Sequence, residues 1–170
     1  MMTHLHNGSF KLAAGALAGL SGTAVMMALR SFDGRYAPKT IPQSRRDPGA
    51  YFVKQTERVT GLTRAVPKPV ETVAATMLRI GYGTLAGVLY AKLRGGRRPA
   101  SALVDGELIG GALYAAGYGG WLPLMRLTPP VWRQRFPQIV GEAVRHVAYG
   151  ITVAAVYRTL GGWQEQGADE

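Results

Sequence analysis

Four ionisable or hydroxyl-bearing side chains share one short stretch of sequence near the C-terminus. They lie at positions i, i+3, i+4 and i+7 and are Glu142, Arg145, His146 and Tyr149. This spacing places all four on the same face of a helix. The surrounding residues are apolar, and ionisable groups in an apolar membrane helix are costly and usually face the interior of a bundle. The pattern therefore indicates a polar cluster inside the protein.

This cluster has two interpretations. In the functional one it forms a ligand-binding or proton-linked site, because histidine is the side chain that titrates near neutral pH and Glu142 would be the neighbour of His146. In the structural one the charges satisfy one another and fix the register of the helices, and we favour this interpretation. A single helix histidine is also compatible with an axial ligand to haem or a chlorin, so the identity of any cofactor is left open.

Arg79 is the only charged residue of another apolar segment, residues 73–91. It lies early in that segment and is expected to enter the membrane from the same side as the C-terminal cluster. We therefore expect an ion pair between Arg79 and Glu142. Arg79 then becomes the fifth member of a polar intramembrane cluster.

The sequence does not predict an enzyme. It contains no cysteine, which removes disulfides, thiolate metal ligands and a cysteine nucleophile. Walker-type Gly-Lys-Ser/Thr, His-Glu-x-x-His and Gly-x-Ser-x-Gly motifs are absent as well. His4 and His6 form a pair without a third ligand nearby, so no metal site is predicted.

Four apolar segments dominate the 170-residue chain, of which 47% is hydrophobic. Each approaches the roughly 20 residues that a helix needs to cross a bilayer. They cover residues 12–29, 73–91, 108–125 and 139–157. A formal charge of +10 is typical either of nucleic-acid-binding proteins or of membrane proteins with basic loops. Because most basic residues fall between the apolar segments, we expect a membrane protein with a lipid bilayer as its partner and no nucleic acid.

Glycine supports the membrane interpretation. The chain has 23 glycines, and many fall inside the apolar segments. In water a glycine inside a helix costs about 1 kcal/mol relative to alanine, which argues against the alternative of a soluble helical core. In a membrane, small residues four positions apart let two helix backbones approach closely. Three such pairs are expected at helix contacts: Gly15 with Gly19, Gly83 with Gly87, and Gly106 with Gly110.

The second and fourth apolar segments share a pattern. Tyr82-Gly83 followed by Tyr90 recurs, at a constant offset, as Tyr149-Gly150 followed by Tyr157. Two helical hairpins of the same orientation would explain this repeat. We therefore predict an all-α integral membrane four-helix bundle, built from two repeated hairpins, as a single membrane domain over residues 1–170.

Residues 30–72 form a long basic loop between the first two segments. Apolar residues at helical spacing between basic ones predict a helix over about residues 50–65, either lying in the headgroup layer against anionic lipid or packed on the bundle. Two prolines predict an extended segment over residues 36–42. The basic residues of the loop favour a cytoplasmic location, whereas the dense basic run at residues 92–98 favours the reverse orientation.

Three features of the chain resemble the YagU-like family of small bacterial inner-membrane proteins. They are a first helix rich in glycine and alanine, a basic loop with prolines over residues 37–48, and a His-x-x-Tyr-Gly sequence formed by His146, Tyr149 and Gly150. The resemblance implies a four-helix, multi-pass protein of the inner membrane. It implies no activity, substrate or catalytic residue.

Three functions are considered. A membrane enzyme that uses the polar cluster is the least favoured of them, because the sequence shows no recognisable nucleophile, metal set or cofactor loop. Two functions remain. The first is an integral membrane protein without catalytic activity, acting as an accessory or structural subunit of a membrane complex or as a self-associating bundle. The second is a small transporter or proton-responsive channel that uses the Glu/Arg/His cluster of the fourth segment. The small-residue faces and the ordered basic loop favour the first function, because they suit docking against other helices.

Overall fold

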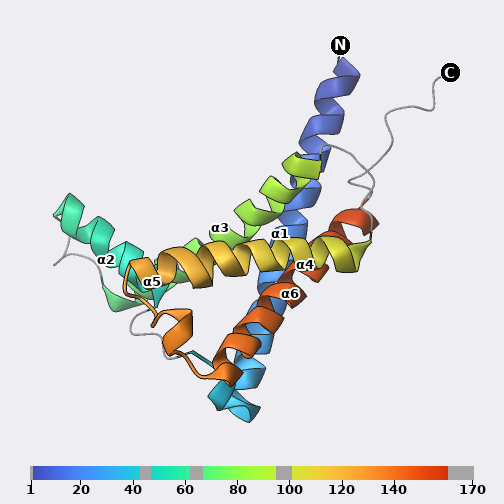
Figure 1. Cartoon of the computed structure of the whole chain (residues 1–170). Coiled ribbons are helices and arrows are strands. Elements are labelled where there is room, and N and C mark those ends of the chain that lie inside the picture. Colours follow the sequence, from blue (N-terminus) through green and yellow to red (C-terminus); the bar gives the residue numbers. More distant parts are fainter. Residues whose placement is uncertain (1, 43–46, 62–66, 95–100, 161–170) are drawn as a thin grey trace.

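The computed structural model describes residues 2–42, 47–61, 67–94 and 101–160. Every regular element in these ranges is a helix, which confirms the predicted all-α class (Figure 1). The three longest helices are α1 (Met2–Tyr36), α3 (Lys68–Arg94) and α6 (Phe136–Thr159). All three are long and apolar enough to cross a membrane.

The long helices extend beyond the apolar segments at both ends. Helix α1 continues through Arg30 to Tyr36, although the predicted segment ended at residue 29. Helices α3 and α6 likewise exceed the predicted ranges 73–91 and 139–157. A charged residue ends an apolar segment but need not end the helix. Long basic side chains in the last turns can still reach water or headgroups.

The third apolar segment was predicted as one helix over residues 108–125, and this prediction was wrong in its start and regularity. Ser101 caps α4 (Ala102–Leu113) by accepting a hydrogen bond from the Val104 N–H at 3.0 Å. The chain continues as a π-helix, η2 (Tyr114–Trp121), and then as the short α5 (Leu122–Leu124). Pro123 lacks an N–H, so the ordinary i to i−4 hydrogen bond cannot form there.

Helix α1 is the centre of the packing. It runs antiparallel to both α3 and α6, and α4 packs antiparallel on α6. Helix α2 (Pro48–Thr60) packs on α3 and lies to one side of the molecule beside α5 (Figure 1). The buried core contains small residues and two tyrosines, Tyr90 and Tyr157, whose rings meet edge to face with centroids 5.3 Å apart.

The six predicted packing glycines all lie where two helix backbones meet. A Cβ on Gly87 would collide with the carbonyl oxygen of Gly15 and with the backbone of Gly19. In the second hairpin, a Cβ on Gly150 would collide with the carbonyl oxygen of Gly106 and lie 2.7 Å from the Gly110 nitrogen. In both hairpins, therefore, one glycine of the second helix fits between two glycines of the first.

Residues 36–42 are not extended as predicted. Helix α1 reaches Tyr36, and Pro38–Thr40 form a 3-10 turn, η1, because proline's fixed φ suits the first position of a helix.

Helix α2 covers part of the predicted range 50–65. Asp47 caps it by accepting from the Ala50 N–H at 3.1 Å, and Gly61 ends it at φ 75°, a conformation that favours glycine. Residues 62–65 of the prediction lie outside the described residues.

Candidate functional site

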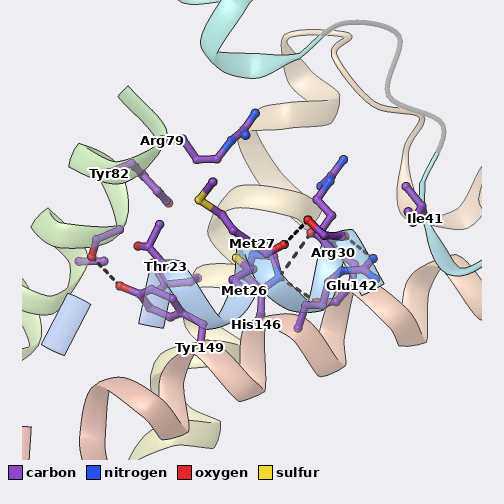
Figure 2. A pocket seen from close by; sticks show the side chains of 15 residues that line it. Thr23, Met26, Met27, Arg30, Ile41, Arg79, Tyr82, Glu142, His146 and Tyr149 are labelled. Atoms are coloured by element: carbon purple, nitrogen blue, oxygen red, sulfur yellow. Dashed lines mark hydrogen bonds and ion pairs between the residues drawn. The ribbon is translucent and has the colours of Figure 1, made fainter. Parts of the chain in front are cut away.

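A cavity of about 410 Å³ lies between α1, α3 and α6, with one contribution from α4. All five residues of the predicted polar cluster line it: Arg79, Glu142, Arg145, His146 and Tyr149. In Figure 2, Arg79 and Tyr82 bound one side of the cavity, and Glu142, His146 and Tyr149 bound the other. Met26 and Met27 of α1 lie between the two sides. The tertiary fold thus gathers residues of α3 and α6 that are far apart in the sequence.

Arg145 is the most deeply buried charge of the cluster, with 2% of its side chain exposed. Its guanidinium donates to Asp33 of α1, to Glu142 Oε2 at 2.7 Å and to the Thr40 carbonyl oxygen at 3.1 Å. These acceptors belong to α1, η1 and α6, so one side chain joins three elements. A buried ion pair is favourable only when further hydrogen bonds satisfy both partners. Both terminal nitrogens of Arg145 are hydrogen-bonded, whereas its Nε has no partner among the described residues.

Arg79 does not form the predicted ion pair with Glu142. It pairs with Asp47, the residue that caps α2, and both side chains of this pair remain partly exposed. Glu142 pairs instead with Arg145, one turn further along α6. The prediction was wrong because it did not anticipate that α2 would pack on α3 and place a carboxylate beside Arg79.

His146 is oriented by its own helix. Its Nδ1 lies 2.9 Å from the carbonyl oxygen of Glu142. A carbonyl oxygen only accepts hydrogen bonds, so Nδ1 carries a proton, an assignment inferred from the hydrogen-bond geometry. The Tyr114 ring packs edge-on at 5.6 Å between centroids. Among the described residues Nε2 has no hydrogen-bond partner. This nitrogen is therefore the one left to accept a proton or bind a ligand.

Tyr149 closes the cavity where α6 meets α3. Its hydroxyl donates to the carbonyl oxygen of Gly83 on α3 at 2.6 Å, and the residue is buried. Thr23 lies beside this bond and donates to the Gly19 carbonyl oxygen at 2.8 Å. The cavity consequently has one closed, uncharged end near Tyr149, while Arg30 and Arg79, both partly exposed, line it nearer the long loop.

Sequence reasoning missed Asp33, which is central to the cluster. The predicted helix ended before it, so Asp33 was treated as part of the loop. A signal was present, because Asp33 is the only acidic residue of the chain before Asp47 and so a natural partner for a buried arginine. The carbonyl of Thr40 carries no comparable signal, since backbone acceptors depend on local folding alone.

A second ion pair, with a buried carboxylate, lies at the C-terminal end of α3. Asp105 of α4 is 1% exposed and pairs with Arg94 at the end of α3. The Tyr90 hydroxyl donates to the same carboxylate at 3.2 Å. This pair joins α3 to α4, as Arg145 joins α6 to α1, and the sequence analysis did not single it out.

Within the described ranges, no three His, Cys, Asp or Glu side chains are grouped so that they could hold a metal ion.

Comparison of the chain with protein-family models, with curated proteins and with solved structures finds no match. The geometry of the cluster, the cavity and the helix surfaces is therefore the basis for a functional assignment.

Proposed function

We propose that the protein crosses the bacterial inner membrane four times. Helices α1, α3 and α6 are each long and apolar enough to do so, and α1 is antiparallel to both of the others. If all three cross, α3 and α6 run in the same direction. The chain must then return through the membrane between them.

The return crossing is assigned to residues 102–124. They form an unbroken helical stretch made of α4, η2 and α5, with 12, 8 and 3 residues. About 20 residues suffice to cross the hydrocarbon core. The arrangement is the one that the YagU-like resemblance implies, with the long basic loop on one side of the membrane and both termini on the other.

Helix α2 fits a position in the headgroup layer on the loop side. Lys54 and Arg58 are exposed, and so are the apolar side chains of Phe52 and Val59. A helix with basic and apolar exposed residues lies favourably where anionic headgroups meet acyl chains. Anionic lipid is therefore the proposed contact of the basic loop.

Within the membrane, we propose that the protein has no catalytic role and acts by associating with another transmembrane helix, either of a second copy or of another subunit. The observation that carries this proposal is a strip of small residues along the outside of α4 and η2. Its members are all exposed and are Gly111, Ala112, Ala115, Ala116 and Gly119. We call this strip the α4 small-residue face.

The α4 small-residue face differs from the glycine pairs predicted for docking. Those glycines already form contacts between helices of the same chain, as Gly15 and Gly19 do with Gly87, so they are not available to a second protein. A Cβ on Gly111, by contrast, would meet no atom within 4 Å. Small residues spaced four apart allow a second helix to approach to van der Waals contact, and this face leaves them available.

Cysteine cross-linking tests the proposal, since the natural chain contains no cysteine. Ala115→Cys is placed in the α4 small-residue face, and Leu85→Cys on the exposed surface of α3 is the matched control. In native membranes under mild oxidation, Ala115→Cys should form a covalent adduct with a second copy or another membrane protein, and Leu85→Cys should not.

The native mass of the detergent-extracted wild-type protein complements the cross-linking. A particle larger than one chain supports the proposal, and its mass distinguishes a second copy from a different subunit. A strictly monomeric particle, together with equal cross-linking of the two cysteine variants, would contradict it.

A small transporter or proton-responsive channel is the second candidate. Two observations favour it. Glu142 and His146 line the cavity, and Nε2 of His146 has no hydrogen-bond partner among the described residues. Reconstitution in liposomes with a pH gradient tests it. Proton flux that disappears in His146→Ala and Glu142→Gln supports transport, and flux equal to that of empty liposomes contradicts it.

A further inference from the structure

The cavity between α1, α3 and α6 has an amphipathic lining. Its apolar residues are Met26, Met27, Ile41, Ala86 and Leu113. Toward the long loop it is flanked by two arginines, Arg30 and Arg79, and Tyr149 closes it where α6 meets α3. A volume of about 410 Å³ is typical of small-molecule sites, which range over roughly 300–1,000 Å³.

Three arginines line the cavity, and Arg30 is the one of them without an ion pair in the part of the chain that the structure describes. Arg145 is ion-paired with Asp33 and Glu142, and Arg79 is ion-paired with Asp47. Among the described residues, Arg30 has neither a hydrogen bond nor an ion pair, although it lines the cavity. An unpaired guanidinium beside an apolar cavity provides a binding point for one carboxylate or phosphate group.

We propose that this cavity binds an anionic amphiphile. Its carboxylate or phosphate contacts Arg30, with Arg79 nearby, and its acyl chain occupies the apolar space along Met26, Met27 and Ala86. Methionine side chains suit such a role, because they are flexible and adapt to irregular apolar shapes. The site is distinct from the basic surface of α2, since it lies between transmembrane helices.

An adjoining cavity strengthens the inference. It has a volume of about 480 Å³ and shares Arg79 and Tyr82 with the first. Phe52, Leu78 and Trp121 give it an apolar lining. The two cavities thus adjoin at Arg79, so an amphiphile whose headgroup lies at Arg30 near Arg79 would have room for a chain in each cavity. A fatty acid and a two-chain phospholipid share the required chemistry, and experiment distinguishes them.

Native mass spectrometry of the purified full-length protein in detergent provides the test. The probes are oleate, phosphatidylglycerol and, as a zwitterionic control, phosphatidylcholine. Oleate binding alone would identify a single-chain ligand, whereas phosphatidylglycerol binding would identify a phospholipid. In either case we expect phosphatidylcholine to bind more weakly than the anionic probe.

Two substitutions with the same change of charge locate the site. Arg30→Gln should weaken binding of the anionic probe about tenfold, as expected for loss of a hydrogen bond to a charged group. Arg35→Gln is the control, because Arg35 belongs to the same helix but does not line the cavity and contacts the Tyr36 ring. It should leave binding unchanged. Both positions are exposed, so neither substitution disturbs the core.

A third variant, Ala86→Leu, fills the apolar part of the cavity and should weaken binding of both anionic probes. Equal losses in Arg30→Gln and Arg35→Gln, tighter or equal binding of phosphatidylcholine, or no adduct with any probe would overturn the proposal. These outcomes are independent of helix association, which is read from the cysteine cross-links. Either proposal can therefore fail while the other stands.

Discussion

The guanidinium of Arg145 on α6 forms an ion pair with Asp33 in the last turns of α1. The same group binds Glu142 and the carbonyl of Thr40, so it fixes the first half of α6 against the end of α1 and against η1. Because all these groups are largely removed from water, each depends on the others for its stability. This relationship accounts for a cluster of charges in the middle of apolar sequence.

Replacing Arg145 should strongly destabilise the fold. Arg145→Ala leaves the carboxylates of Asp33 and Glu142 without their cation, and breaking a buried pair in this way costs about 3–5 kcal/mol. Arg79→Ala removes an ion pair whose two side chains are 46% and 42% exposed, so its cost should stay below about 1 kcal/mol. Unfolding of the two variants in mixed micelles, followed by circular dichroism, measures both losses. Similar losses would show that the Arg145 network does not hold the helices together.

Gly87 and Gly81 provide a matched pair on α3. A Cβ on Gly87 would collide with the backbones of Gly15 and Gly19, whereas one on Gly81 would meet nothing within 4 Å. Gly87→Ala should therefore separate α1 from α3 and lower stability by about 1–3 kcal/mol, the usual range for overpacking. Gly81→Ala should be neutral or slightly stabilising, since alanine is the better helix former.

The melting temperatures of these two glycine variants in the same detergent compare the sites directly. A loss confined to Gly87→Ala supports the close contact between the helices. If Gly81→Ala is the more harmful of the two, the assigned packing of α3 against α1 is wrong.

Tyr149 and Tyr82 occupy equivalent positions of the sequence repeat but different environments. Tyr149 is buried and its hydroxyl donates to the Gly83 carbonyl oxygen, while Tyr82 is 50% exposed. Tyr149→Phe should lower stability by about 0.5–1.5 kcal/mol, the net value of a typical hydrogen bond. Tyr82→Phe should change it little. Chemical denaturation in micelles measures both, and equal effects would show that the hydrogen bond contributes nothing specific.

Hydrophobic patterning located the three longest helices because it reports burial in an apolar phase, but it missed the start and the π-helix of the third segment. It placed α3 and α6 within a few residues and found the existence of α2 from its helical spacing. It placed the ends poorly at α1, because the helix continues through Arg30 and the residues around Asp33. A pattern of apolar residues marks the hydrocarbon layer, and helices need not stop at its edge.

The partners of the charged side chains were harder to predict. The spacing along α6 correctly placed Glu142 and His146 beside the same cavity, since neighbours on one helix follow from geometry alone. The partner of Arg79 depended on the docking of α2, and the third acceptor of Arg145 is a backbone carbonyl. Such contacts arise from tertiary structure, which a single sequence does not encode in any local pattern. The π-helix η2 is a similar case.

The central claim, that the chain crosses a membrane four times, is tested most directly by the accessibility of single cysteines. Thr3→Cys and Ala168→Cys report on the two termini, and Lys54→Cys and Arg133→Cys report on α2 and on the connection before α6. Intact and inverted inner-membrane vesicles are treated with a membrane-impermeant maleimide. We expect the two terminal cysteines to react in one kind of vesicle and the other two to react in the opposite kind. Reaction of Lys54→Cys and Arg133→Cys on opposite sides, or recovery of the protein in the soluble fraction without detergent, would contradict the account.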